Sequence, residues 1–341
     1  MCEEGIYGEE NMSVPFFRAK QNPKYEEVAC DVIRSGKYIL GDYVRVFEDA
    51  VAERYNVKHA IGVGSGSDAV YLACEVVFGG TSNWVACPTL TFVATAESIF
   101  RMGSIPTFRD VDDETLCSDS RDVNVNLYGN RITQECKVQD MAQAMGQEFV
   151  GEVGCFSFFP TKSLGCIGDG GMIITDNDEY ADIIRSMAQH GRSKEDKYTY
   201  ERHGINSRLD AIQAAILTIK LTELDDDLEM RQKIARMYNE RLEGYVRLPY
   251  PDSVFNYYVI RTEKRDELKK YLDSKEIASM IYFPKPLHKY DLFPDADCPV
   301  AEKACEEVLA LPIYPNMPLE EVDTVCGVIK ECVDKKRIMN D

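Results

Sequence analysis

The sequence predicts an α/β protein, with a mostly parallel sheet covered by helices on both faces and a smaller C-terminal α/β domain. Over the first two thirds of the 341 residues, short apolar segments alternate with amphipathic helical segments, and this order is typical of such a sheet. The pattern changes at the acidic stretch from Glu223 to Glu229. We therefore expect a large domain over residues 12–225 and a small domain over residues 226–341.

The elements of the large domain follow from the spacing of apolar residues. Helical spacing predicts two initial helices at 25–36 and 45–55. Apolar runs bounded by turn residues predict strands at 59–63, 84–87, 105–108, 122–127, 136–139, 154–159 and 171–175. Further helices are expected at 68–77, 92–102, 179–189 and 208–221.

The small domain shows a different pattern. The acidic stretch is expected to continue into a long helix through Tyr238. Beyond it we expect a strand, a helix, a proline-rich loop and a last helix, at 255–261, 264–274, 284–298 and 319–335.

The charge balance limits the classes of partner. The chain has 58 acidic and 39 basic residues, for a net charge of −19, and nucleic-acid binding needs a basic face. No run approaches the roughly 18 apolar residues of a membrane helix. Residues 1–11 are acidic and lack the apolar stretch of a signal peptide. We therefore expect a cytoplasmic protein with neither nucleic acid nor membrane as a partner.

The cysteines are numerous but do not have the spacing of a metal site. There are twelve cysteines and four histidines, and no CxxC pair. Zinc sites need clustered ligands at short spacing. We therefore expect no metal, and we interpret the cysteines as buried free thiols in a reducing compartment.

A glycine-rich turn, GVGSGSD at 62–68, joins a predicted strand to a predicted helix. Its glycines allow a tight turn, and the free amides at a helix start favour a phosphate. The spacing is GxGxG, whereas dinucleotide sites need GxGxxG. The turn is thus either a phosphate cradle or an ordinary strand-to-helix connection.

Two ionisable residues follow predicted strands. Asp140 comes directly after strand 136–139, where an acid either points into a ligand crevice or caps a helix. Lys162 lies between an aromatic strand and a glycine-rich turn, in FSFFPTKSLGCIGDGG. This setting can desolvate an amine and make it nucleophilic, although most lysines are solvated surface charges.

Asn206 and Arg208 lie at the start of the helix predicted at 208–221. They are either a contact to an anion or a helix cap with a surface arginine. The chain thus offers, in order, a phosphate cradle, an acid, a lysine and a late anion contact.

With these motifs in this order, the chain resembles the DegT/DnrJ/EryC1/StrS family of nucleotide-sugar aminotransferases, which depend on pyridoxal phosphate. The similarity extends from about Val14 to Val328 and includes SGKYILGDYVRVFE, GVGSGSDAV, QDMAQAMG, FSFFPTKSLGCIGDGG and GINSRLDAIQAAIL. The segment around Lys162 is the most specific. The resemblance implies the aspartate aminotransferase fold (fold type I) and a homodimer with shared active sites.

The resemblance also implies a role for each matched residue. Lys162 would carry the cofactor as a Schiff base and transfer protons, and Asp140 would pair with the pyridine nitrogen. The other implied cofactor contacts are Gly66, Ser67, Asp68 and Ser157 at the phosphate, Phe92 and Ala142 on the ring faces, Gln143 near the ring hydroxyl, and Asn206 from a second subunit. Tyr282, His288 and Arg192 are candidate substrate contacts, with a core, loop or surface role as the alternative.

The chain departs from the family pattern in three places. The family sequence Glu-Asp-Ala-Ala-Gln is here QDMAQ at 139–143, the stretch 119–136 is shorter, and the usual His-Tyr-Pro is YFP at 282–284. These differences put the surface geometry and the substrate contacts in question, whereas the lysine itself is retained.

The resemblance implies transfer of an amino group from L-glutamate, through pyridoxamine phosphate, to a nucleotide-linked keto-6-deoxyhexose. The sequence SGKYILG is closer to the branch that acts on 3-keto sugars, so C3 of a dTDP- or UDP-sugar is expected. Amination at C4 of a dTDP-, UDP- or GDP-sugar is the alternative. A non-catalytic regulatory or scaffold protein is the alternative of another class, and Asp140, Gln143, Ser157 and Lys162 argue against it.

Overall fold

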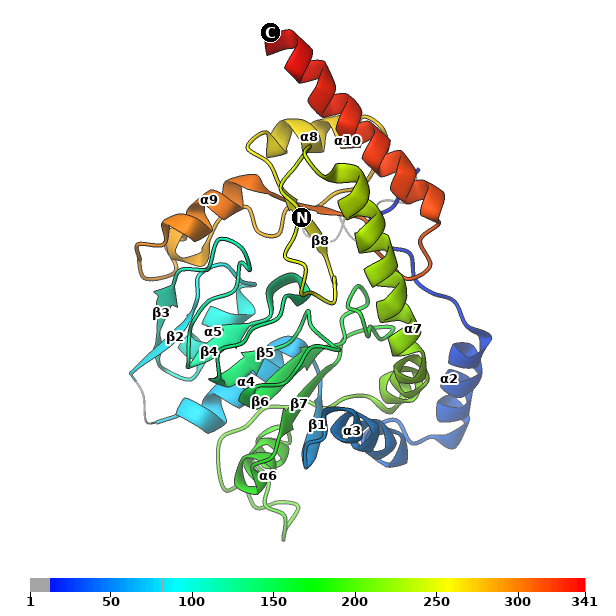
Figure 1. Cartoon of the computed structure of the whole chain (residues 1–341). Helices are drawn as coiled ribbons and strands as arrows, with labels where there is room; N and C mark the ends of the chain where they lie inside the picture. The colour runs from blue at the N-terminus through cyan, green and yellow to red at the C-terminus, as the bar shows by residue number, and fades with distance from the viewer. Residues whose placement is uncertain (1–12, 81–82, 341) are drawn as a thin grey trace.

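A five-stranded mixed sheet forms the centre of the computed structural model, which describes residues 13–80 and 83–340 (Figure 1). In spatial order its strands are β1 (His59–Val63), β7 (Gly171–Thr175), β6 (Gly151–Ser157), β5 (Cys136–Asp140) and β4 (Val123–Val125). β4, β5 and β6 pair in parallel, whereas β7 pairs antiparallel with both β6 and β1. The predicted α/β class is confirmed, and β7 is the one strand of this sheet that runs against the others.

The remaining elements connect and cover these strands. The helices before residue 243 are α2 (Pro23–Ser35), α3 (Asp42–Tyr55), α4 (Gly66–Phe78), α5 (Ala94–Arg101), α6 (Asp178–Met187) and α7 (Ala211–Leu242). β2 (Trp84–Pro88) and β3 (Ile105–Arg109) form a separate parallel pair. The C-terminal part contains β8 (Tyr258–Arg261), α8 (Arg265–Asp273), η2 (Leu287–Lys289), α9 (Pro299–Glu307), β9 (Val308–Leu311) and α10 (Leu319–Asn340). A short 3-10 turn, η1 (Leu127–Gly129), follows β4.

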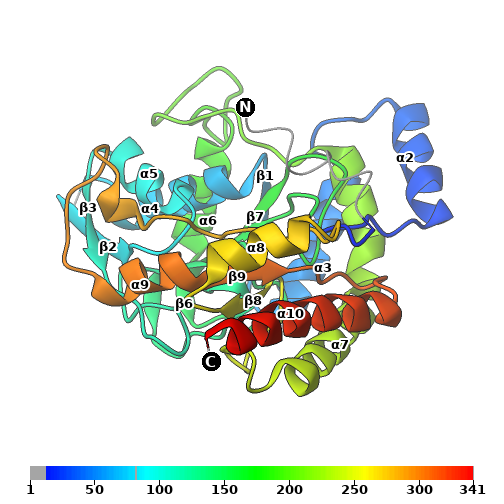
Figure 2. The same cartoon turned by 90° about the horizontal axis from the view of Figure 1, so that it is seen from above.

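The two faces of the sheet are covered by different helices. Successive strand residues point to opposite faces, so Ile61 and Ile173 pack with α4 and α6 on one face. Ala60 and Ile174 pack with α3 and α7 on the other. The views in Figures 1 and 2 show this layered arrangement, with β8, α8 and α10 set to one side of it.

The helix termini are set by local sequence signals. Asn22, Ser65 and Asn177 precede α2, α4 and α6, and the side chain of each accepts a hydrogen bond from an amide of the first turn. Such caps satisfy amides that have no partner within the helix. Gly36 ends α2 in a left-handed conformation with φ of 68°, which glycine adopts without strain.

α7 differs from the prediction, which placed a change of pattern at the acidic stretch. The helix is continuous over 32 residues and crosses residues 225 and 226. Its acidic side chains are paired, with Asp225 at 2.6 Å from Arg54 and Asp227 at 2.7 Å from Lys20. The division at 225/226 therefore stays a prediction. α9 and β9 were not predicted, because no turn residue separates them in the sequence.

Several expectations on composition concern only part of the chain. The predicted lack of a leader rests on residues 1–11, which lie outside the described residues. Across 13–80 and 83–340, no helix is both long enough and apolar enough to span a bilayer. Every cysteine in these ranges is a free thiol, and no cluster of potential metal ligands occurs in them.

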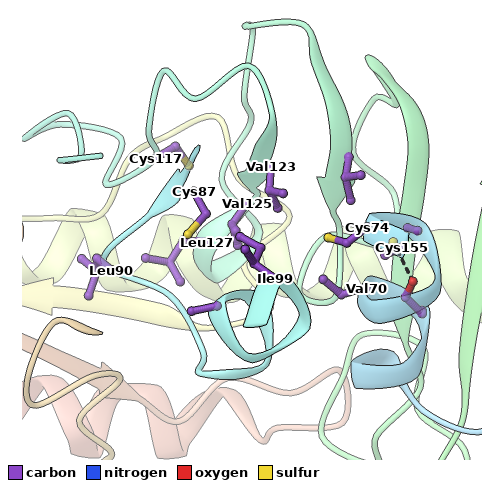
Figure 3. Close-up of a cluster of buried hydrophobic side chains, with 14 of the residues drawn as sticks. Val70, Cys74, Cys87, Leu90, Ile99, Cys117, Val123, Val125, Leu127 and Cys155 are labelled. Carbon is purple, nitrogen blue, oxygen red and sulfur yellow. Dashed lines mark hydrogen bonds between the residues drawn. The ribbon is translucent and has the colours of Figure 1, made fainter. Parts of the chain in front are cut away.

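A buried apolar cluster lies between α4, α5 and the strands (Figure 3). Cys74, Cys87 and Cys155 are part of it, and the Cys155 thiol donates to the carbonyl of Ala69 at 3.4 Å. Burial raises the pKa of the Cys74 and Cys155 thiols well above the ordinary value, because a thiolate would lose its hydration there. These cysteines therefore act as small apolar core residues.

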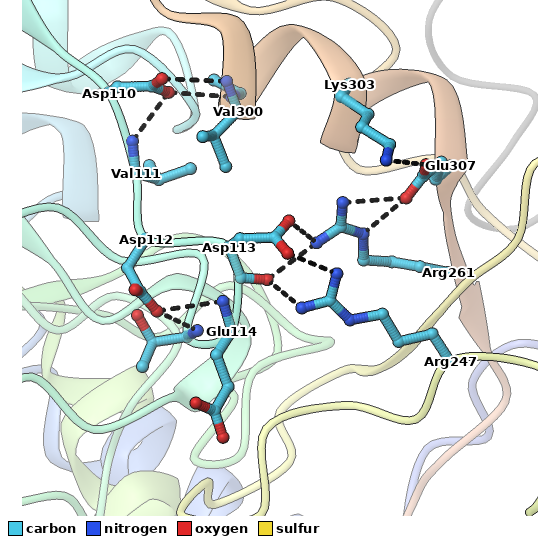
Figure 4. A network of polar contacts seen from close by, with 12 residues as sticks. Asp110, Val111, Asp112, Asp113, Glu114, Arg247, Arg261, Val300, Lys303 and Glu307 are labelled. Atoms are coloured by element: carbon cyan, nitrogen blue, oxygen red, sulfur yellow. Dashed lines mark hydrogen bonds and ion pairs between the residues drawn. The ribbon is translucent and has the colours of Figure 1, made fainter.

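A charged network joins the loop after β3 to the C-terminal part (Figure 4). Arg261 on β8, with 5% of its side chain exposed, lies 2.7 Å from Asp113 and donates to Glu307 at 2.9 Å. Arg247 reaches the same Asp113 carboxylate at 2.7 Å. Two arginines and two carboxylates thus connect segments that lie more than 130 residues apart in the sequence.

The same loop caps α9 (Figure 4). The carboxylate of Asp110 accepts hydrogen bonds from the amides of Val300 and Ala301 at 2.9 and 2.8 Å. These amides belong to the first turn of α9, where the helix dipole favours a negative charge. The loop after β3 therefore holds the start of α9 against the large sheet-containing part.

We expect Asp113→Asn to destabilise the protein in a pH-dependent way. Hydrogen bonds from Arg247 and Arg261 hold the pKa of the Asp113 carboxyl below its usual range. This stabilisation is therefore present above the unfolded-state pKa near about 4 and is lost as pH falls through the folded-state pKa. Urea unfolding at a series of pH values should show the difference from the unsubstituted protein shrinking below about pH 4. A difference that stays constant would contradict this account.

Asp31→Asn provides the control. Asp31 forms an exposed i,i+3 pair with Arg34, and such pairs contribute at most about 0.5 kcal/mol. At neutral pH this substitution is expected to change the unfolding free energy by no more than that.

Candidate active site

The carboxyl ends of three parallel strands open into a cavity of about 400 Å³, within the range of small-molecule sites. The last residues of β4, β5 and β6 are Val125, Asp140 and Ser157, and all three line the cavity. Parallel strands end at the same sheet edge, where α/β proteins bind ligands. The start of α4, the segment 91–94 and the segment 280–283 provide other walls.

The first turn of α4 faces this cavity. Gly66 and Ser67 line it, and their amides have no partner within the helix because they precede its first i to i−4 bond. A Cβ atom on Gly66 would lie 2.5 Å from the Cβ of Ser157, so only glycine allows α4 to begin this close to β6. The arrangement suits a phosphate group, which accepts hydrogen bonds from amides at a helix start.

Asp68 supports this turn without lining the cavity. Its amide is capped by Ser65, and its carboxylate accepts a hydrogen bond from the Ser207 hydroxyl at 2.7 Å. The same hydroxyl accepts from the amide of Gly64 at 2.8 Å. Ser207, which the sequence analysis did not single out, therefore holds the turn from the segment that precedes α7.

Asp140 lies at the base of the cavity with 6% of its surface exposed. Its carboxylate accepts hydrogen bonds from the amide of Ala142 at 3.0 Å and from the hydroxyl of Thr95 at 3.1 Å. Burial nevertheless raises the pKa of the Asp140 carboxyl, because the charge loses its hydration. The charge of Lys162 opposes this rise in pKa without cancelling it. A protonated pyridine nitrogen would stabilise the carboxylate further, so the residue fits the predicted cofactor.

Lys162 lies in the turn after β6 and lines the same cavity. Its amide donates to the carbonyl of Phe159 at 2.9 Å. Its Nζ is 5.7 Å from the centroid of the Tyr257 ring, within the range of a cation–π contact. The structure thus brings the amine, the acid and the helix start together in one cavity.

The predicted ring contacts also line the cavity. Ala142 and Gln143 follow Asp140, and the Gln143 side-chain oxygen accepts from the amide of Tyr128 at 2.6 Å. Phe92 is 53% exposed, and its ring centroid is 6.2 Å from that of Phe283. An exposed aromatic ring at the cavity wall is available to cover a flat ligand.

Of the three predicted substrate contacts, Tyr282 alone lines the cavity. The His288 side chain is fully buried, with Nδ1 at 2.7 Å from the hydroxyl of Thr89 and Nε2 at 3.1 Å from Glu302. These contacts favour the alternative core role of His288, and its role as a substrate contact stays a prediction. Arg192 donates to the side-chain oxygen of Gln189 at 3.0 Å, away from this cavity.

Asn206 is exposed and forms a backbone bridge with Gln189. It does not line the cavity of its own chain. This position is compatible with the predicted contact to a second subunit, which stays a prediction.

Several cavity residues were not identified from the sequence. Thr95 and Tyr257 both reach the site, and Tyr128 ties two of its walls, since its hydroxyl donates to the carbonyl of Tyr282. Thr95 follows the TLTF segment that contains Phe92, so spacing along α5 could have suggested it. Tyr257 and Tyr128 have no local signal, because their contacts depend on the fold.

Comparison with known proteins identifies a family. The model of the DegT/DnrJ/EryC1/StrS aminotransferase family matches residues 20–132 and 136–330. A pleiotropic regulatory protein of Geobacillus stearothermophilus is 38% identical over 91% of this chain and 94% of its own length. A UDP-2-acetamido-2-deoxy-3-oxo-D-glucuronate aminotransferase of Pseudomonas aeruginosa is 32% identical over 87% of this chain and 93% of its own.

A third relative and a solved structure agree with this result. A dTDP-3-amino-3,4,6-trideoxy-alpha-D-glucose transaminase of Streptomyces venezuelae is 31% identical over 96% of this chain and 98% of its own length. The crystal structure of S. venezuelae DesV in complex with a ketimine intermediate superimposes with a TM-score of 0.85 and 31% identity, covering 91% of this chain and 94% of that one. The fold described above is therefore that of these enzymes.

We expect Gly66→Ala to weaken the binding of pyridoxal phosphate by at least about tenfold, or ~1.4 kcal/mol. The added methyl group would lie 2.5 Å from the Cβ of Ser157 and would push the start of α4 away from β6. Equilibrium dialysis with the cofactor measures the affinity, and circular dichroism checks that the fold is retained.

Gly327→Ala is the matched control. A Cβ atom at Gly327, on α10, would meet nothing within 4 Å, so it should leave the affinity unchanged and stabilise α10 by up to about 1 kcal/mol. Equal affinities for Gly66→Ala and the unsubstituted protein would exclude the first turn of α4 as the phosphate site.

Proposed function

Because the chain belongs to the DegT/DnrJ/EryC1/StrS aminotransferase family, we propose that it transfers the amino group of L-glutamate to C3 of a nucleotide-linked keto-6-deoxyhexose. It is a pyridoxal-phosphate-dependent nucleotide-sugar aminotransferase. The observation that carries the proposal is the presence of Lys162, Asp140 and the first turn of α4 around one cavity.

The residues present fit the cofactor. When bound, pyridoxal phosphate supplies an electron sink that stabilises negative charge on the carbon bearing the amino group. The amides of Gly66 and Ser67 and the hydroxyl of Ser157 would bind the phosphate, and Asp140 would hold the proton of the pyridine nitrogen. Lys162 would be the point of covalent attachment.

Lys162 would also carry the proton in each half of the reaction. Once released by the amino donor, its amine would accept a proton from the donor carbon in the first half and would return a proton to the sugar carbon in the second half. Asp140 keeps its place through the hydrogen bonds from Thr95 and Ala142. The rings of Phe92 and Tyr257 both line the cavity and would cover part of a bound cofactor.

The names of two relatives support the position on the sugar. The P. aeruginosa enzyme is named for a 3-oxo sugar linked to UDP, and the S. venezuelae enzyme for a 3-amino-6-deoxy sugar linked to dTDP. Amination at C3 of a UDP- or dTDP-sugar is therefore preferred to amination at C4. The 6-deoxy feature rests on the S. venezuelae name.

A second copy of the chain would complete the site. Among the described residues that line the cavity, Lys162 is the one basic side chain, whereas a sugar nucleotide carries a diphosphate that attracts several cations. We propose that a partner subunit supplies Asn206 and Arg192. The exposed apolar residues Tyr38 and Ile39 lie on the surface and would be covered in such a homodimer.

The free thiols support a cytoplasmic location. Ten of the eleven described cysteines are buried and none is paired. Thiols remain reduced in the cytoplasm, whereas oxidising compartments favour disulfides. The substrates are thus expected to be cytoplasmic metabolites.

A regulatory role is the second candidate. It is favoured by the name of the G. stearothermophilus relative, which is 38% identical. The buried acid at the cavity base disfavours it, because burial raises the pKa of the Asp140 carboxyl despite the charge of Lys162. A protein without cofactor chemistry does not need such a costly buried carboxylate.

The first test is the absorbance spectrum of the protein with pyridoxal phosphate. We expect a visible band from the lysine-linked cofactor, loss of this band on addition of L-glutamate, and no such band in Lys162→Ala. A band that glutamate leaves unchanged would exclude glutamate as the amino donor. The absence of any band in the unsubstituted protein would leave the regulatory role as the better proposal.

The second test addresses the carbon that is aminated. In the reverse direction, with 2-oxoglutarate as acceptor, dTDP- or UDP-linked 3-amino-6-deoxyhexoses should react with a kcat/KM at least about tenfold above that of the 4-amino isomers. Glutamate formation measures both rates. A preference for the 4-amino isomers would reverse the assignment.

A further inference from the structure

The turn that carries Lys162 is held by Asn256, which precedes β8 in the C-terminal part. Lys162 lies between β6 and β7, outside any helix or strand, so hydrogen bonds must fix its backbone. The side-chain oxygen of Asn256 accepts two of them, from the amide of Ser163 at 2.9 Å and from its hydroxyl at 3.2 Å. Asn256 is 2% exposed, so water does not compete for this contact.

The orientation of the Asn256 amide is determined by its partner. A backbone amide can only donate, so the atom that faces Ser163 is the oxygen of Asn256. The Nδ2 atom of Asn256 is buried and has no hydrogen-bond partner among the described residues. An unsatisfied buried donor costs free energy. Asn256 thus has one unsatisfied donor, Nδ2, and one neutral acceptor, Oδ1, which binds Ser163, the residue after Lys162.

Aspartate would provide the same acceptor without the idle donor. It would also place a negative charge one residue from Lys162, and a nearby opposite charge favours the protonated form of an amine. A catalytic lysine must lose its proton to act as a base. The amide of asparagine therefore meets two requirements, because it accepts hydrogen bonds and carries no charge.

The backbone of Asn256 is fixed from α7. Nη1 of Arg231 donates to the carbonyls of Phe255, Asn256 and Ile313, at 3.1, 3.3 and 3.1 Å. Arg231 is buried, and burial lowers its pKa to about 10, so it remains charged at neutral pH. A charged donor shared by three carbonyls restrains the segment that contains Asn256.

We propose that Asn256 is a positioning residue for Lys162, which acts through Ser163 and is itself held by Arg231. The segment also presents Tyr257, whose ring lies beneath the Lys162 amine. The two residues before β8 thus have separate roles. Asn256 binds the backbone beside Lys162, and Tyr257 lies against its amine. The inference rests on the proposed function of Lys162, although the contact itself can be measured without cofactor.

The contact is tested by hydrogen exchange on the cofactor-free protein, resolved at the Ser163 amide. We expect this amide to exchange roughly tenfold faster in Asn256→Ala, which loses the acceptor, and to remain protected in Asn256→Asp, which keeps it. Asn239→Ala is the matched control, because Asn239 bonds Tyr258 of the adjacent strand and not Ser163. Unchanged protection in Asn256→Ala, or equal loss in Asn239→Ala, would overturn the proposal.

The consequence for the lysine is tested in the cofactor-loaded protein. We expect Asn256→Ala to slow the loss of the visible band with glutamate by at least about tenfold, at an unchanged half-saturating glutamate concentration, and we expect Asn256→Asp to raise the pH midpoint of the band by about one unit. If Asn256→Ala does not fold, the proposal is tested by the pH midpoint of the visible band in Asn256→Asp. A midpoint equal to that of the unsubstituted protein would overturn the proposal. A missing band in the unsubstituted protein would refute the proposed function, while the exchange experiment would still report on the contact.

Discussion

The close approach of α4 to β6 is the constraint on which the rest of the site depends. Gly66 lies so near Ser157 that any Cβ atom would separate the two elements. This approach places helix amides beside the ends of β5 and β6, where Asp140 is and where the turn with Lys162 begins. The first turn of α4, the buried acid Asp140 and the amine of Lys162 therefore line one cavity, because the backbone of α4 packs directly against β6.

The C-terminal part shapes the site and restrains its residues, whereas the ionisable groups of the site come from the segments around the central sheet. Asp140 is the last residue of β5, and Lys162 follows β6. The segments 255–257 and 280–283 form walls of the cavity, and Asn256 restrains the turn with Lys162. The Asp113 and Asp110 contacts join the loop after β3 to β8 and to the start of α9. Arg261 and Arg231 are buried cations of this acidic chain, and each has defined carboxylate or carbonyl partners.

The parts of the site that could be predicted are those beside strand ends and glycine turns. Gly66, Asp140 and Lys162 each stand next to a segment whose pattern is visible over a few residues, and the fold class follows from the alternation of such segments. Asn256, Tyr257 and Tyr128 could not be predicted, because each depends on which distant segment packs against it. The continuity of α7 was missed for a related reason, since its acidic residues are neutralised by partners such as Arg54 and Lys20.

The uninterrupted course of α7 also limits how such chains can recombine in evolution. A crossover between two relatives near residue 225 joins two half-helices, and each inserted or deleted residue there rotates everything beyond it by about 100°. Arg231 would then turn away from the three carbonyls that it restrains. An exchange of whole halves between relatives must therefore preserve the helical phase of α7.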